Sequence, residues 1–118
     1  MRDFRKYDLW EDSMGLVDLI YDLVSLFPES EKYGLSSQMI RAVISIPSNI
    51  AEGSSRESEK DFARFLQIAL GSAFELETQL LIANRRKYII DQERINEIIV
   101  TIQSIQKRLY GLKRKLNK

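Results

Sequence analysis

The sequence predicts an all-α fold, an up-down-up-down four-helix bundle in which residues 1–118 form a single domain. Apolar residues recur at three- and four-residue intervals along most of the chain, which is the period of amphipathic helices. Five glycines and two prolines leave little material for the tight turns of an all-β fold. A length of 118 residues with 44% hydrophobic and 30% charged residues is ordinary for one globular domain.

The first helix is expected between Trp10 and Phe27. Pro28 ends it, because the residue before a proline is pushed out of the α region. Two apolar sets follow its length: Trp10, Val17, Ile20, Val24 and Phe27, and also Leu16, Leu19, Leu23 and Leu26. A single core-facing stripe would need only one of them.

The second helix is expected to begin with Ser36 or Ser37 as its N-cap and to run to about Gly53, a plausible C′ residue. Pro47 lies inside this helical pattern. It removes the hydrogen bond to the Val43 carbonyl, so the sequence predicts a kink in the helix there.

The third helix is expected to follow Ser58 as N-cap and to run to about Arg86, with Asp61 in place of the usual Glu or Gln of a capping box. The last helix follows Asp91 as N-cap. Its heptad is unbroken and reads Ile95, Ile98, Ile102, Ile105, Leu109, Leu112 and Leu116. Four helices joined by short connections favour the up-down-up-down bundle.

The first and third helices carry more apolar surface than one seam of a monomeric bundle needs. The apolar residues of the third helix are Phe62, Phe65, Leu66, Ile68, Ala69, Leu70, Ala73, Phe74, Leu76, Leu80, Leu81 and Ile82. Large exposed apolar patches are usually covered by a partner, and identical copies are the commonest partner. We therefore expect a homo-oligomer.

The composition argues against most enzyme chemistry. The chain has no cysteine and no histidine, so it lacks a thiolate nucleophile and the most common general base and metal ligand. It also lacks a glycine-rich phosphate loop. We expect no catalysis, no cofactor and no metal. The charged N-terminal segment and the absence of about 20 consecutive apolar residues indicate a cytoplasmic protein without a membrane span.

The net charge of +1 hides an uneven distribution. Residues 1–31 hold eight acids and three bases, whereas residues 98–118 hold six bases and no acid. This asymmetry indicates either an anion-binding end or two oppositely charged segments lying side by side. The candidate nucleic-acid-binding residues are Arg85, Arg86, Lys87, Lys107, Arg108, Lys113, Arg114 and Lys115. Basic residues near helix C-termini also complement the helix dipole, which is the alternative explanation.

A polar stripe on the second helix is the other candidate site. Its members recur at three- and four-residue intervals: Gln38, Arg41, Ser45, Asn49, Glu52 and Arg56. One interpretation is a polar binding face. The alternative is a structural network that uses the backbone groups freed by Pro47.

A recognisable string occupies the same helix. Arg41-Ala42-Val43-Ile44-Ser45-Ile46-Pro47-Ser48-Asn49-Ile50-Ala51-Glu52-Gly53, preceded by Tyr33-Gly34-Leu35-Ser36-Ser37-Gln38, resembles the 23S rRNA intervening-sequence proteins. Phe65-Leu66, Ile68-Ala69, Gly71-Ser72 and Glu75-Leu76-Glu77-Thr78 resemble the same family's third-helix motif. Ile40 and Leu70 stand where the family often has basic residues.

The resemblance implies a four-helix bundle that assembles as a ring-like homopentamer. It also implies association with nucleic acid or a reverse transcriptase, as in the accessory proteins of diversity-generating retroelements. We therefore expect an oligomer that binds RNA or an RNA-associated protein. The alternative is a protein-interaction scaffold without nucleic-acid binding.

Overall fold

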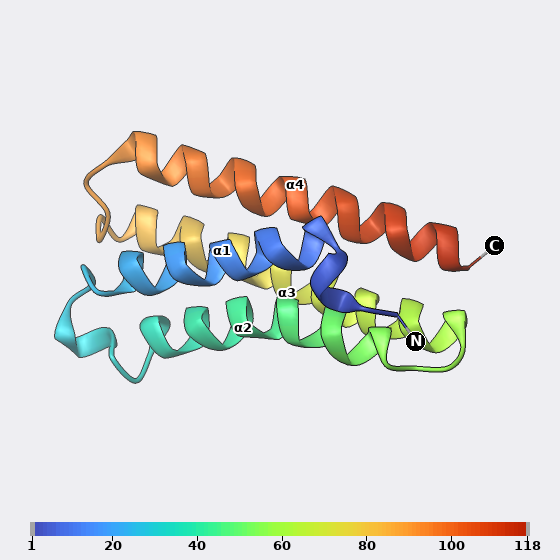
Figure 1. Cartoon of the computed structure of the whole chain (residues 1–118). Helices are drawn as coiled ribbons and strands as arrows, with labels where there is room; N and C mark the ends of the chain where they lie inside the picture. Colours follow the sequence, from blue (N-terminus) through green and yellow to red (C-terminus); the bar gives the residue numbers. More distant parts are fainter. Residues whose placement is uncertain (1, 118) are drawn as a thin grey trace.

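The computed structural model describes residues 2–117, and four helices account for most of them (Figure 1). They are α1 (Asp8–Val24), α2 (Leu35–Ser54), α3 (Glu59–Arg85) and α4 (Gln92–Leu116), with two short 3₁₀ turns, η1 (Phe4–Lys6) and η2 (Glu29–Glu31). Successive helices run in opposite directions along a body of 43 × 25 × 20 Å. The predicted all-α four-helix bundle is confirmed.

The core is made by the faces that the three-four spacing predicts. Leu16, Ile20 and Leu23 of α1 are fully buried. On α4 the first five heptad positions are buried, and Leu112 and Leu116, near the end of the helix, are half-buried. Each fully buried Leu or Ile contributes about 1.5–3 kcal/mol relative to exposure. This burial stabilises helices whose exposed faces carry charge.

The start of α2 differs from the prediction of Ser36 or Ser37 as N-cap. The helix begins at Leu35, and both serines lie in its first turn. The backbone N–H of Leu35 donates instead to the Glu31 carboxylate at 3.1 Å. A side chain from the preceding 3₁₀ turn therefore satisfies the helix end, which leaves no capping function for the two serines.

Gly53 was predicted as a C′ residue, and this prediction is wrong. It lies inside α2, which continues to Ser54. A Cβ at this position would lie 2.7 Å from the Cβ of Phe65 and 2.9 Å from a ring carbon of Phe62. Gly53 is therefore needed for the close approach of α2 and α3. Pro47 is buried within α2, and the kink there stays a prediction.

The caps of the last two helices match the sequence. Ser58 Oγ accepts from the Asp61 N–H at 3.0 Å, and an Asp91 carboxylate oxygen accepts from the Arg94 N–H at 3.2 Å. The reciprocal half of the capping box on α3 is replaced, because the Asp61 carboxylate binds Arg64 and Arg56.

Candidate nucleic-acid interface

The structure divides the predicted basic residues between the two ends of the bundle. Arg85, Arg86 and Lys87 lie where α3 passes into the connection to α4. The remaining five follow the C-terminal half of α4, which ends near the α2–α3 turn (Figure 1). The two groups therefore do not form one basic surface on a single chain.

Two residues of the Arg85–Lys87 group, Arg86 and Lys87, contribute to the local structure at this end of the bundle. Lys87 has a φ of 65° and closes α3, with its N–H bonded to Asn84 O and that of Tyr88 bonded to Ala83 O. This is the Schellman arrangement that ends many helices. The Leu35 N–H lowers the pKa of Glu31 most, followed by the Tyr88 hydroxyl, and the charge of Arg86 lowers it further. Arg86 therefore acts electrostatically on the neighbouring α1–α2 connection.

Among the basic residues of α4, Arg108 is already paired. Its guanidinium lies 2.8 Å from the Asp12 carboxylate of α1. This contact shows that the acidic N-terminal segment and the basic C-terminal segment do lie side by side at one point. Arg108 is thus the weakest member of the predicted nucleic-acid-binding set.

The other basic residues of α4 keep their charge unneutralised. Within residues 2–117, Lys107, Arg114 and Lys115 are exposed and take part in none of the ion pairs. Lys113 donates to a neutral acceptor, Gln67 Oε1, at 2.6 Å. Tyr110 is 49% exposed, with Lys113 and Arg114 5.5 and 5.8 Å from its ring centre. The end of α4 therefore presents cations around an accessible aromatic ring.

The middle of the polar stripe is a hydrogen-bonded network between α2 and α3. Asn49 donates to the carbonyl and the hydroxyl of Ser45 at 2.7 and 2.9 Å. The Ser45 hydroxyl in turn lies 2.8 Å from that of Ser72. Within residues 2–117 no side-chain hydrogen bond reaches the Val43 carbonyl that Pro47 leaves without its donor. The network therefore joins two helices but does not repair the backbone at Pro47.

The outer members of the stripe behave differently. Gln38 and Arg41 are exposed near the start of α2. At the other end, Arg56 lies 3.7 Å from both Glu52 and Asp61. The stripe is thus structural at its centre and ionic where α2 meets α3.

A second arginine, which the sequence analysis did not single out, joins this ionic group. Arg64 lies 3.0 Å from the Asp61 carboxylate, so one carboxylate contacts two guanidinium groups. Arg56 and Arg64 also lie 4.7 and 4.6 Å from the ring centre of Phe65. The 60/64 spacing of Lys60 and Arg64 puts both on one face of α3, and this was the signal that could have revealed them.

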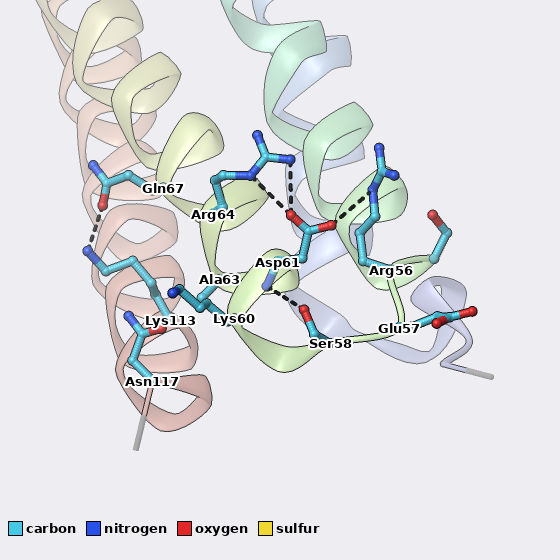
Figure 2. A pocket seen from close by; sticks show the side chains of 11 residues that line it. Arg56, Glu57, Ser58, Lys60, Asp61, Ala63, Arg64, Gln67, Lys113 and Asn117 are labelled. Carbon is cyan, nitrogen blue, oxygen red and sulfur yellow. Dashed lines mark hydrogen bonds and ion pairs between the residues drawn. The ribbon is translucent and has the colours of Figure 1, made fainter.

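These residues line an open cleft at the end of the bundle, between the α2–α3 turn, the first turns of α3 and the last turns of α4 (Figure 2). Arg56 lies on one side of Asp61 and Arg64, and Lys113 on the other. The full lining comprises Ser55, Arg56, Glu57, Ser58, Lys60, Asp61, Ala63, Arg64, Gln67, Lys113 and Asn117. All the lining residues except Ala63 are polar or charged, and positive side chains outnumber negative ones.

Two further observations concern the chain between residues 2 and 117. No helix in this part is long and apolar enough to cross a membrane. The same residues hold no cluster of three or more Asp and Glu side chains arranged to bind a metal ion.

The model of the 23S rRNA-intervening sequence protein family matches residues 5–111, nearly the whole chain. The chain belongs to this family. Its fold also matches the crystal structure of a protein of unknown function from the S23 ribosomal protein family of Bacteroides thetaiotaomicron, with a TM-score of 0.81 and 29% identity over 89% of this chain and 97% of that chain. No curated protein matches the chain.

Membership in the intervening-sequence family gives the string on α2 a structural context. Ser45, Asn49 and Gly53 all lie on the side of α2 that contacts α3 through Ser72, Phe62 and Phe65. In this member of the family the string is thus a helix-packing motif, and its ionic end opens into the cleft.

Proposed function

We propose that this chain is a non-enzymatic, cytoplasmic protein that self-associates and binds RNA, or a protein associated with RNA. The observation that carries the proposal is the set of unneutralised cations at the end of α4. Lys107, Arg114 and Lys115 have no carboxylate partner among residues 2–117. Lys113 donates a hydrogen bond to the neutral amide of Gln67. Cations of this kind contact phosphates without reading sequence.

Self-association is supported by apolar side chains that the bundle leaves exposed. On α3, Phe74 is 58% exposed and Ile68, Leu81 and Ile82 are each more than 40% exposed. In the second apolar set, Leu19 on α1 and Leu26 just after this helix are exposed, whereas Leu16 and Leu23 are buried. The family resemblance favours a homopentamer as the assembly.

Assembly matters for binding because one α4 terminus offers only a few cations. Several copies held in one particle act at high effective concentration on a long polyanion. A weak contact per subunit then gives measurable affinity for the whole assembly.

The test is a titration of the protein with labelled RNA at two salt concentrations, with the particle mass measured by light scattering. We expect a particle of several times 13.8 kDa and an affinity that falls steeply with salt, because neutralised phosphates release counterions. A 13.8 kDa particle, or the absence of RNA binding at low salt, would contradict the proposal.

The second candidate is a protein-interaction scaffold without nucleic-acid binding. It is favoured by the exposed apolar side chains on α1 and α2, among them Met14, Tyr21 and Ile44. Complexes built on such contacts bury apolar area and respond little to salt. This alternative would be identified by a complex with a partner protein that retains no RNA and has the same stability at low and high salt.

A further inference from the structure

We infer that the cleft at the α2–α3 turn is a phosphate-binding site for the RNA backbone, and that Lys60, Arg64 and Arg56 complete it together with Lys113. The inference rests on the proposed function and adds cations from the α2–α3 turn and from α3 to those of α4. The predicted RNA contact then extends from the end of α4 to a surface formed by the α2–α3 turn, the start of α3 and the end of α4.

The first argument is charge. The cleft is lined by four cationic side chains, Arg56, Lys60, Arg64 and Lys113, and by two carboxylates, Glu57 and Asp61. An excess of two positive charges therefore gathers in one concave surface of a chain whose net charge is only +1. A concave surface lined by one excess sign raises the local concentration of the opposite ion.

The second argument is preorganisation. Asp61 contacts Arg56 at 3.7 Å and Arg64 at 3.0 Å, and both guanidinium groups lie against the Phe65 ring, which is buried. The Asp61 carboxylate and the Phe65 ring thus orient both guanidinium groups, and each group keeps N–H donors for a further acceptor. The Arg56 Nε atom is buried, and it faces Asp61 Oδ2 at 3.7 Å, which is beyond hydrogen-bond distance. Planar guanidinium groups bind phosphate oxygens in pairs, so an arrangement of two held arginines suits a phosphate.

The third argument concerns Lys113 and Lys60. Gln67 holds Lys113 over the cleft by a hydrogen bond of 2.6 Å that costs the ammonium group none of its charge. Lys60 is exposed on the same wall and pairs with no carboxylate of residues 2–117. Ser55, Ser58 and Asn117 add neutral polar groups to the lining. This composition fits a sugar-phosphate backbone better than an apolar or cationic ligand.

The experiment compares two double variants of the full-length protein with identical charge change. Lys60→Gln with Arg64→Gln removes two cations from the cleft, and Arg85→Gln with Arg86→Gln removes two from the opposite end. We expect the cleft variant to lose about tenfold or more in RNA affinity and to flatten the salt dependence by about two phosphate contacts. The control variant should bind as the parent does. Equal losses in both variants, or an unchanged cleft variant, would overturn the inference.

A second measurement separates this inference from the proposed function. The parent protein is titrated with inorganic tripolyphosphate while the amide NMR signals of residues 55–67 are followed. Shifts confined to these residues and to the end of α4 around Lys113, and absent in the cleft variant, would support the phosphate site even if RNA failed to bind. RNA binding by the parent without such shifts would leave the proposed function standing and reject the cleft.

Discussion

The Tyr88 hydroxyl donates a 2.8 Å hydrogen bond to the Glu31 carboxylate, across 57 positions of sequence. The same carboxylate accepts from the Leu35 N–H at the start of α2. Glu31 therefore joins the α1–α2 connection to the α3–α4 connection, and it does so in its charged form.

This arrangement predicts a pH-dependent contribution to stability. The hydrogen bonds from Leu35 and Tyr88, with the charge of Arg86, lower the pKa of Glu31 in the folded chain. A lowered pKa stabilises the fold above the unfolded value of about 4.3, and the contribution disappears as the pH falls through the folded value. We expect Glu31→Gln to lower the melting temperature at pH 7. At a pH below the folded pKa of Glu31, the variant and the parent should have the same melting temperature.

Glu29→Gln is the matched control, since it neutralises an exposed carboxylate in the same 3₁₀ turn. This variant should leave the melting temperature nearly unchanged both at pH 7 and at the acid pH. A constant difference between Glu31→Gln and the parent across this range would show that the charge of Glu31 is irrelevant.

The contact of Gly53 with α3 predicts a strong response to one methyl group. Gly53→Ala places a Cβ at 2.7 Å from the Phe65 Cβ, so the helices must separate. We expect a loss of about 1–3 kcal/mol, as for other overpacked sites, despite the better helix propensity of alanine. Urea denaturation measures it.

Gly71→Ala provides the comparison, because nothing lies within 4 Å of a Cβ at that exposed position of α3. It should raise stability by about 0.5–1 kcal/mol. If the two variants changed stability in the same direction, helix propensity rather than packing would govern both glycines.

The network at the α2–α3 seam predicts a moderate effect for Asn49→Ala. The variant loses the two bonds to Ser45, but the Ser45 hydroxyl keeps its contact with Ser72. We expect a loss of about 1 kcal/mol, the usual net value of such hydrogen bonds. A double-mutant cycle with Ser72→Ala should show coupling, and strict additivity would mean that the three side chains do not form one network.

The positive φ of Lys87 predicts a stabilising substitution. Lys87→Gly relieves the cost of a side chain in the left-handed region at the end of α3 and should gain up to about 1 kcal/mol. Lys87 lies at the end of the bundle opposite the cleft, so the Lys87→Gly variant should bind RNA with the affinity of the parent. Reduced RNA binding by Lys87→Gly would restore the original prediction that Arg85, Arg86 and Lys87 contact nucleic acid.

The periodicity of the sequence was sufficient to predict the helices but not all of their ends. The unbroken heptad from Ile95 to Leu116 gave α4 correctly, because a long repeat specifies both the element and its buried face. The start of α2 was missed because its capping acceptor, Glu31, comes from outside the helix. Capping rules based on Ser, Thr, Asp and Asn at the boundary cannot detect such a partner.

The candidate site shows the same division between local and long-range information. The basic run of α4 is visible in the sequence, but its pairing with Asp12 through Arg108 depends on the packing of α1 against α4. Lys60 and Arg64 were overlooked because they alternate with Glu59 and Asp61, so the segment looks electrically balanced. Folding pairs Asp61 with Arg56 and Arg64, whereas Lys60 has no carboxylate partner among residues 2–117.

Both described ends of the chain lie beside the cleft. Arg2 donates to the carbonyls of Ser54 and Arg56 in the α2–α3 turn, and Asn117 is part of the cleft wall. An affinity tag or fluorescent protein fused to either terminus would therefore stand at the mouth of the surface whose binding it was meant to report. The connection between α1 and α2, at the far end of a 43 Å body, is the place for a label that leaves the cleft open.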